Sequence, residues 1–229
     1  MTRRYDTIVV GTGAGGMTAG LELARQGRSV LLLEAAKQLG GMLNPFSRRK
    51  VHFDIRVHYL GEAGPGETMR RLLDSLGLEG VRFREIDPDC IDRYVFEGYE
   101  TKLIKGLDRW IELLAGDFPA EKDNLHRFGR LMRACAALSR MTVKGPSIRG
   151  AREVLLSGPE IARLLTSTYA DVLAKSFRDP MLRNAMAGPS GDIGLPPSRS
   201  SALMSVVLLN HYLGGAYYPV GGSGAMRDA

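Results

Sequence analysis

The stretch IVVGTGAGGMTAGLELARQGRSVLLLE, residues 8–34, decides the fold class of this chain. It starts inside a short β-branched run, TIVV, that is typical of a buried parallel strand. Gly11, Gly13 and Gly16 follow at the spacing that permits a tight turn, a close approach of phosphate to the backbone and close helix–strand packing. A helix and a second strand, SVLLLE, complete a unit that predicts a Rossmann-like α/β domain.

The same unit predicts the groups that would hold a dinucleotide. The amides of Gly13 and of the next three residues, Ala14, Gly15 and Gly16, stand at a helix N-terminus, where pyrophosphate binds. Glu34 ends the second strand, 23 residues after Gly11, where an acid binds ribose hydroxyls. This carboxylate would repel a 2′-phosphate, so NADP is disfavoured. The competing interpretation is a glycine-rich turn in an unrelated α/β domain.

The residues after Glu34 bear on the choice between FAD and NAD. Ala35 opens a run that reaches the pair Gly40 and Gly41, and Met42 follows this pair. A glycine pair permits a second close approach of backbone to a long cofactor. The run EAAKQLGGML resembles the extension that follows the acid in flavoproteins with two dinucleotide-binding domains. We therefore predict FAD, with Ala35, Gly40, Gly41 and Met42 in the cofactor site.

Residues 50–61, KVHFDIRVHYLG, alternate strictly between polar and apolar side chains. This period of two predicts one strand, with an apolar face formed by Val51, Phe53, Ile55, Val57 and Tyr59. The segment is similar to the FD-x-G-x-HY pattern of the family of retinol saturases, phytoene desaturases and carotenoid isomerases. SGDIGLPPSRSS, HYLGGAYYPVGGSGAM and the pair Phe118-Pro119 also resemble that family, so the likeness spans nearly the whole chain.

The resemblance implies an FAD-dependent oxidoreductase that transfers hydride between flavin and a carbon–carbon bond of an apolar polyene. It also implies that His58 and Tyr59 lie on the flavin side, and it identifies no catalytic acid or base. Two positions depart from the family: Arg56 replaces a glycine of the pattern, and Met42 stands where many relatives have arginine or threonine. A large cation at position 56 would crowd the flavin or point to solvent.

The resemblance covers the front half of such flavoproteins. It predicts a Rossmann-like FAD domain over residues 1–65, an inserted and largely helical α+β substrate domain over 66–214, and the start of a return to the FAD domain over 215–229. One alternative is a truncated, non-catalytic flavin-binding fragment or pseudoenzyme, which chain length and Arg56 favour. A flavoprotein amine oxidase is the second alternative.

Composition excludes some partners. The 229 residues carry a formal charge of +6, yet acids and bases interleave and no zinc-finger or RNA-binding signature occurs, so no nucleic acid partner is expected. Cys90 and Cys135 form no metal-binding or redox motif, so reduced thiols in a cytoplasmic protein are expected, with no metal. No secretory signal or spanning segment is expected either. The region 121–141 reads as a basic amphipathic helix, for which peripheral membrane contact is an alternative to ordinary packing.

Overall fold

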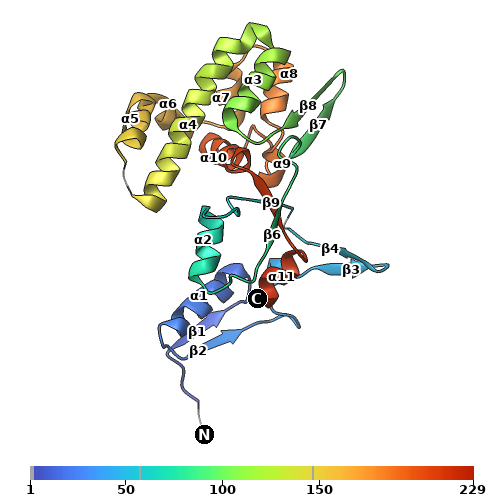
Figure 1. The fold of residues 1–229 in the computed structure, drawn as a ribbon, viewed down its shortest axis with the longest axis vertical. Helices are drawn as coiled ribbons and strands as arrows, with labels where there is room; N and C mark the ends of the chain where they lie inside the picture. The colour runs from blue at the N-terminus through green and yellow to red at the C-terminus, as the bar shows by residue number, and fades with distance from the viewer. Residues whose placement is uncertain (1–2, 57, 146) are drawn as a thin grey trace. The chain divides into compact units, whose positions relative to one another are not determined.

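The computed structural model describes residues 3–56, 58–145 and 147–229, and it forms two compact units (Figure 1). The first unit contains the chain up to Ile86 together with Ala216–Ala229, and the second contains Asp87–Gly215. The sequence placed the functional boundaries at 66 and 214, and those boundaries remain a prediction about substrate binding. In the structure, the segment 66–86 packs with the first unit.

The first unit begins with the predicted strand–helix–strand arrangement. Strands β1 (Thr7–Val10) and β2 (Val30–Leu33) pair in parallel, and helix α1 (Ala14–Arg25) connects them. A parallel pair needs a crossover of this kind because its two strands run in the same direction. Gly27, with φ +81°, turns the chain after α1 and toward β2. The Rossmann-like fold class is thereby confirmed for this part of the chain.

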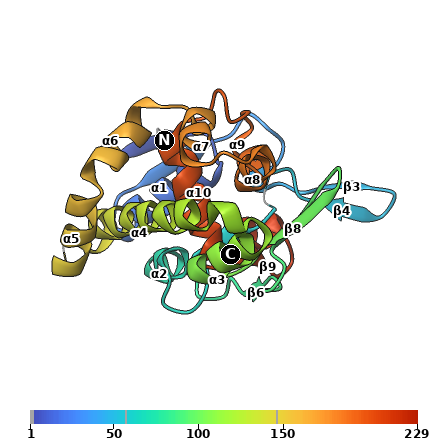
Figure 2. The same cartoon turned by 90° about the horizontal axis from the view of Figure 1, so that it is seen from above.

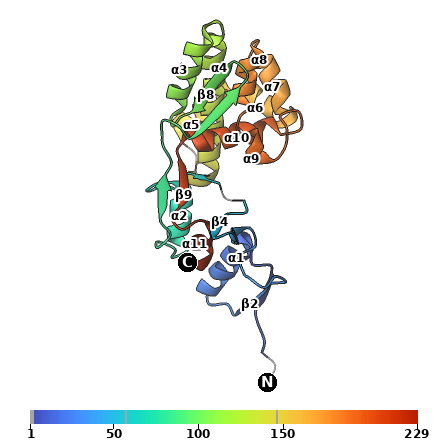
Figure 3. The same cartoon turned by 90° about the vertical axis from the view of Figure 1, so that its right-hand side faces the viewer.

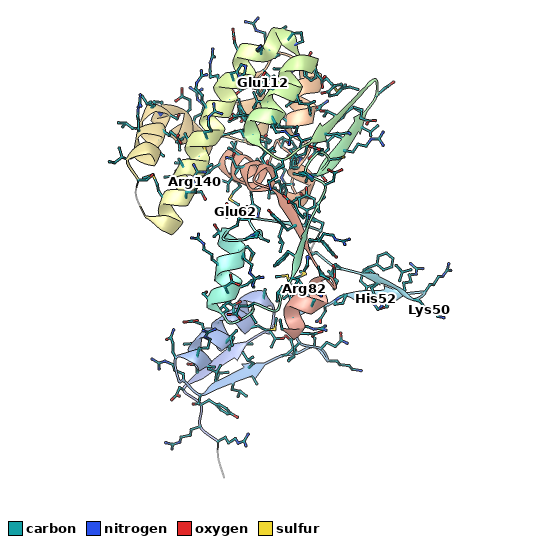
Figure 4. The ribbon with its side chains drawn as sticks, in the orientation of Figure 1. Lys50, His52, Glu62, Arg82, Glu112 and Arg140 are labelled. Atoms are coloured by element: carbon teal, nitrogen blue, oxygen red, sulfur yellow. The ribbon has the colours of Figure 1, made fainter. Side chains whose placement is uncertain are left out.

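The prediction of one strand over residues 50–59 is wrong. After the 3₁₀ helix η1 (Gly41–Leu43), the chain forms a short antiparallel hairpin of β3 (Phe46–Arg48) and β4 (Val51–Phe53). Lys50 and His52 project from this hairpin in Figure 4. The strand ends after Phe53, and Val57 lies outside the described residues.

Hydrogen bonds at Asp54 explain why the alternation does not continue as a strand. The backbone N–H of Ser223 and the side-chain hydroxyls of Ser223 and Tyr218 all donate to the Asp54 carboxylate. These groups come from a segment more than 160 residues further along the chain. The pattern of residues 50–59 contains no sign of these distant partners.

A small three-stranded sheet brings the C-terminal segment into the first unit. Its order is β5 (Leu60–Gly61), β9 (Ala216–Pro219) and β6 (Phe83–Glu85), and β9 is antiparallel to both neighbours. Helices α2 (Thr68–Ser75) and α11 (Ser223–Asp228) complete the unit. Strand β6, in the segment VRFREID, thus pairs with β9 and not with the following segment DRYVFEGYE.

The second unit is mostly helical. DRYVFEGYE forms the hairpin of β7 (Asp92–Phe96) and β8 (Tyr99–Leu103), which Figures 1 and 3 show beside α3. The Tyr99 hydroxyl donates to Asp117 of α3 at 2.8 Å. The helices and the 3₁₀ helix are α3 (Leu107–Asp117), η2 (Pro119–Glu121), α4 (Lys122–Lys144), α5 (Ile148–Leu156), α6 (Gly158–Thr166), α7 (Tyr169–Ser176), α8 (Pro180–Met186), α9 (Ser190–Ile193) and α10 (Ala202–Leu213).

The core of the second unit is dense. Its fully buried large side chains include Trp110, Tyr169 and Phe177. The predicted apolar face of α4 is part of this core, since Met132 is 0 % exposed and Cys135 is 1 % exposed. This part of the face therefore packs inside the protein. Within the described residues, no helix is both long and apolar enough to cross a membrane.

Candidate dinucleotide-binding site

The three motif glycines have different structural roles. Gly11 has φ +95°, a left-handed conformation that glycine adopts without strain. A Cβ on Gly16 would lie 2.1 Å from the carbonyl oxygen of Gly11, so only glycine lets α1 approach the turn this closely. Gly13 is extended, with φ −62° and ψ 173°, and a Cβ there would meet nothing within 4 Å. Its backbone therefore faces open space at the start of α1.

Thr12 and Glu34 fasten this turn to the end of β2. One carboxylate oxygen of Glu34, Oε2, accepts hydrogen bonds from the Thr12 N–H at 2.9 Å and from its hydroxyl at 2.5 Å. The other oxygen, Oε1, accepts from the Ala36 N–H at 2.9 Å. The Thr12 hydroxyl, followed by the backbone N–H groups, lowers the pKa of Glu34 to about 2. Glu34 is thus a fixed negative charge at neutral pH.

The second glycine pair lies against the first motif. Gly40 has φ +114°, and its N–H donates to the Thr12 hydroxyl at 3.2 Å. A Cβ on Gly41 would lie 3.0 Å from the Cα of Gly13. The structure therefore brings Gly11–Gly16, Glu34 and Gly40-Gly41 into one place. The first turn of α1 presents amides without intrahelical partners to the same place.

The other predicted residues have less specific surroundings. Ala35 is exposed next to Glu34, and Met42 is 54 % exposed in η1. His58 is exposed, and its ring meets that of Tyr59 edge to face, 5.0 Å between centroids. Arg56, at the family's glycine position, is also exposed. The assignment of His58 and Tyr59 to a flavin remains a prediction.

Sequence reasoning missed two residues of the site. Thr12 is fully buried and joins Glu34 to Gly40, yet it occupies a variable position of the glycine motif. The one local feature that could have indicated Thr12 is a small hydroxyl side chain between two glycines. The second missed residue is Arg227 of α11. Its side chain packs against Gly40, since its Cδ would lie 2.6 Å from a Cβ on Gly40. It also donates to Asn44 at 2.6 Å, and no local pattern connects two residues 183 positions apart.

Asp54 is a structural carboxylate of the first unit rather than a free acid. It is half-buried, and burial by itself would raise its pKa. The hydrogen bonds from Ser223 and Tyr218 outweigh burial and hold the pKa below its usual range. Among the described residues, no group of three or more His, Cys, Asp or Glu side chains is arranged to hold a metal.

Comparison with known proteins supports the Rossmann-like fold of this region. Residues 9–76 match a family model described as an NAD(P)-binding Rossmann-like domain. An inactive all-trans-retinol 13,14-reductase of Danio rerio is 29% identical, over 95% of this chain and 37% of that protein. The human all-trans-retinol 13,14-reductase is 26% identical, over 96% of this chain and 38% of the relative. Prolycopene isomerase 1 of an Oncidium hybrid cultivar is 26% identical, over 98% of this chain and 40% of that protein.

The chain is homologous to these reductases and isomerases. It spans about two fifths of the length of these relatives, which fits the predicted correspondence to one part of such a protein. The homology confirms the resemblance that the sequence motifs indicated.

Solved structures show the same fold. A putrescine oxidase bound to putrescine has a TM-score of 0.62 at 16% identity, covering 99% of this chain and 49% of that one. Cyclohexylamine oxidase from Brevibacterium oxydans has a TM-score of 0.60 at 18% identity, covering 98% of this chain and 48% of that one. At this identity the likeness concerns fold alone.

Proposed function

We propose that this chain binds FAD through residues 8–42 and forms part of an oxidoreductase that acts on carbon–carbon bonds of an apolar polyene. The observation that carries the proposal is that the two glycine motifs lie against each other at the start of α1. A Cβ on Gly13 would meet nothing, while Gly41 stands close behind it. Homology to retinol reductases and prolycopene isomerases supports an apolar polyene as the substrate.

Each residue of the site has a role that its geometry suits. The amides from Gly13 to Gly16 bind the pyrophosphate, which the positive end of α1 also attracts. Glu34, kept ionised by its hydrogen bonds, accepts from the adenosine ribose hydroxyls and repels a 2′-phosphate. Ala35, Gly40, Gly41 and Met42 lie along the cofactor. When bound, FAD supplies the hydride-transfer chemistry, and this chain supplies position and electrostatics.

The substrate side of the proposal rests on residues 66–214 as the substrate domain. An apolar polyene suits a helical domain with many aliphatic side chains, and peripheral contact with a membrane belongs to the same proposal. His58 and Tyr59 are assigned to the flavin side as positioning residues.

A non-catalytic flavin-binding role is the second candidate. The exposed Arg56 replaces the family's glycine, and the 29% identical relative from Danio rerio carries the word inactive in its name. An amine oxidase is less well supported, because the likeness to amine oxidases is confined to the fold.

Product analysis separates these candidates. The purified chain is loaded with FAD, reduced anaerobically with dithionite, and incubated with all-trans-retinol or with a carotenoid of cis configuration. The oxidoreductase proposal predicts a new chromatographic product that requires FAD, and more of it from Arg56→Gly if the cation crowds the flavin. Retained flavin without product from either protein would contradict it and favour the non-catalytic role.

A further inference from the structure

The second unit contains a cavity of about 580 Å³ between α4, α6 and α7. All of its lining residues belong to Asp87–Gly215, whereas the proposed FAD site belongs to the first unit. Its volume lies within the roughly 300–1,000 Å³ that is typical of small-molecule sites. Figure 2 shows α6 and the neighbouring α5 alongside α4.

The inner wall of the cavity is apolar. Phe128 of α4, Leu164 of α6 and Val172 of α7 line it, and each is at most 5 % exposed. These side chains belong to the core of the second unit and hold the three helices in place. An aliphatic group lying against them would be removed from water, at about 25 cal/mol for each Å² of apolar surface buried.

The rim of the cavity is strongly basic. Arg127 and Arg130 extend from α4, Arg163 from α6 and Lys175 from α7, and all four are exposed. Glu160 is the only acidic residue among the lining residues. Within the described parts of the chain, none of these four cations has a salt bridge or a side-chain hydrogen bond. An anion would thus meet several cations that have no competing partner.

Exposed aliphatic residues continue the apolar wall outward. Leu156, which lines the cavity, is 71 % exposed, and Leu155 beside it on α5 is 80 % exposed. Ile148, two turns earlier on α5, is 93 % exposed, and Leu165 of α6 is 65 % exposed. Large aliphatic side chains exposed together mark a surface that binds an apolar group.

We propose that this cavity binds an anionic amphiphile, a molecule with a carboxylate or phosphate head and an aliphatic tail. Arginine guanidinium groups at the rim suit a carboxylate or phosphate, because their planar fork forms paired charge-assisted hydrogen bonds. The tail lies against the apolar wall and Leu156. The molecule comes either free from solution or from the surface of an anionic bilayer.

Calorimetric titration of the whole chain with laurate, below the concentration at which it forms micelles, tests the head and the tail together. We expect one laurate per chain, and weaker binding of the neutral dodecanol and of inorganic phosphate. The double variant Arg127→Glu/Arg130→Glu should weaken laurate binding at least about tenfold, since a hydrogen bond to a charged group contributes roughly 1.5–3 kcal/mol. Leu156→Asn should weaken the binding of laurate but not the binding of phosphate.

Arg140→Glu is the matched control. Arg140 is an exposed arginine of the same helix, labelled in Figure 4, and it does not line the cavity. It should leave laurate binding within about twofold of the wild type, because charges beyond a Debye length of about 8–10 Å are largely screened. An equal loss in Arg140→Glu would contradict a site and indicate a general charge effect. Circular dichroism confirms that each variant is folded.

Sedimentation with vesicles distinguishes the two sources of the amphiphile. Vesicles of phosphatidylcholine alone are compared with vesicles that also contain phosphatidylglycerol. Binding of laurate and of the anionic vesicles, both reduced by Arg127→Glu/Arg130→Glu, would support the cavity and place its ligand in a bilayer. Laurate binding alone would support a free ligand.

Vesicle binding without laurate binding would overturn the cavity proposal in favour of surface contact, and binding of neither would overturn it outright. Phosphate binding as tightly as laurate would also overturn it, because the tail would then contribute nothing. The titration needs no flavin, so its failure leaves the proposed FAD site unaffected.

Discussion

Adjacent glycines in the GxGxxG turn tolerate a side chain very differently. A Cβ on Gly16 would lie 2.1 Å from a backbone oxygen, whereas a Cβ on Gly15 would meet nothing within 4 Å. Both residues lie in α1 and differ by one position. The contrast separates a packing requirement from the general preference of the motif for glycine.

Gly16→Ala should therefore destabilise the first unit by more than about 1 kcal/mol, because backbone must shift to relieve the overlap. Gly15→Ala should fold at least as well as the wild type, since alanine is favoured over glycine in a helix by about 1 kcal/mol. Urea unfolding of the two variants measures the difference. Equal stability would show that α1 does not approach the carbonyl of Gly11 as closely as described.

The pH dependence of stability tests the contact between Glu34 and Thr12. The pKa of Glu34 is lowered from 4.5 to about 2 in the folded chain. A group with a depressed folded pKa contributes stability above its unfolded pKa, and this contribution is lost as the pH falls toward the folded pKa. Between pH 5 and pH 2, the melting temperature of the wild type should fall further than that of Glu34→Gln. If the melting temperatures of the two proteins fell in parallel, the hydrogen bonds to Glu34 would be contradicted.

Sequence reasoning found the glycines and Glu34 because both belong to a local pattern with fixed spacing. It missed Thr12, whose importance depends on the contact of its hydroxyl with Gly40, 28 positions away. It could not assign Arg56 either, because the consequence of that cation depends on where the side chain points.

A buried carboxylate joins two helical elements in the second unit. Glu121 is 4 % exposed, and its Oε1 accepts from the N–H groups of Arg178 at 2.5 Å and Asp179 at 2.8 Å. Asn124 donates to its Oε2 at 2.6 Å. Asp179 in turn caps α8 through Met181 and Leu182. The start of α8 thus depends on a residue from η2.

Glu121→Ala should destabilise the second unit by about 2–4 kcal/mol, because it leaves two N–H groups without acceptors at about 1–3 kcal/mol each. Glu112→Ala is the control, since Glu112 is an exposed glutamate of α3, and a change of less than about 0.5 kcal/mol is expected there. Thermal unfolding followed by circular dichroism provides both values. If Glu121→Ala left the stability unchanged, water would have replaced the carboxylate as the acceptor, contrary to this prediction.

At the element scale, helices with a clear apolar face were predicted well, and short strands were not. Residues 122–144 form a helix, as the amphipathic pattern of residues 121–141 indicated. The alternating segment 50–59 failed because tertiary hydrogen bonds to Asp54 replace strand pairing there. Residues 158–186 form three helices, since the chain breaks at Ser167-Thr168 as well as before Pro180.

The two units differ in how completely their cores are covered. The largest fully buried side chains, from Trp110 to Val206, all belong to the second unit. In the first unit, Ile8 is 57 % exposed and Val10 is 82 % exposed, although both lie on β1 of a parallel pair. Parallel strands are normally covered on both faces. The first unit therefore presents apolar strand surface to solvent.

This exposed strand surface should make the isolated chain associate. Light scattering is expected to show a mass that rises with protein concentration, because uncovered strands pair with other chains. Val10→Lys should reduce the association, since a charge on an exposed strand opposes such pairing. A stable monomer at every concentration would contradict this expectation.

At the scale of the whole molecule, the sequence predicted the Rossmann-like fold from glycines and an acid that lie close together in the chain. Motifs spread over nearly the whole chain indicated the resemblance to retinol reductases and carotenoid isomerases. The division into two units was less predictable, because it depends on β9 returning to pair with β5 and β6. No local pattern encodes pairing between strands more than 130 residues apart.

Residues 8–42 are proposed to hold FAD. The most direct test is the visible absorption spectrum of the purified chain after addition of FAD and removal of the excess, with Gly13→Ala as the paired variant. Flavin bands near one FAD per chain are expected for the wild type. Their loss is expected in a folded Gly13→Ala, whose new methyl group would meet no protein atom within 4 Å but would occupy the space proposed for the pyrophosphate. No flavin on the folded wild type, or equal flavin on both proteins, would contradict the proposal.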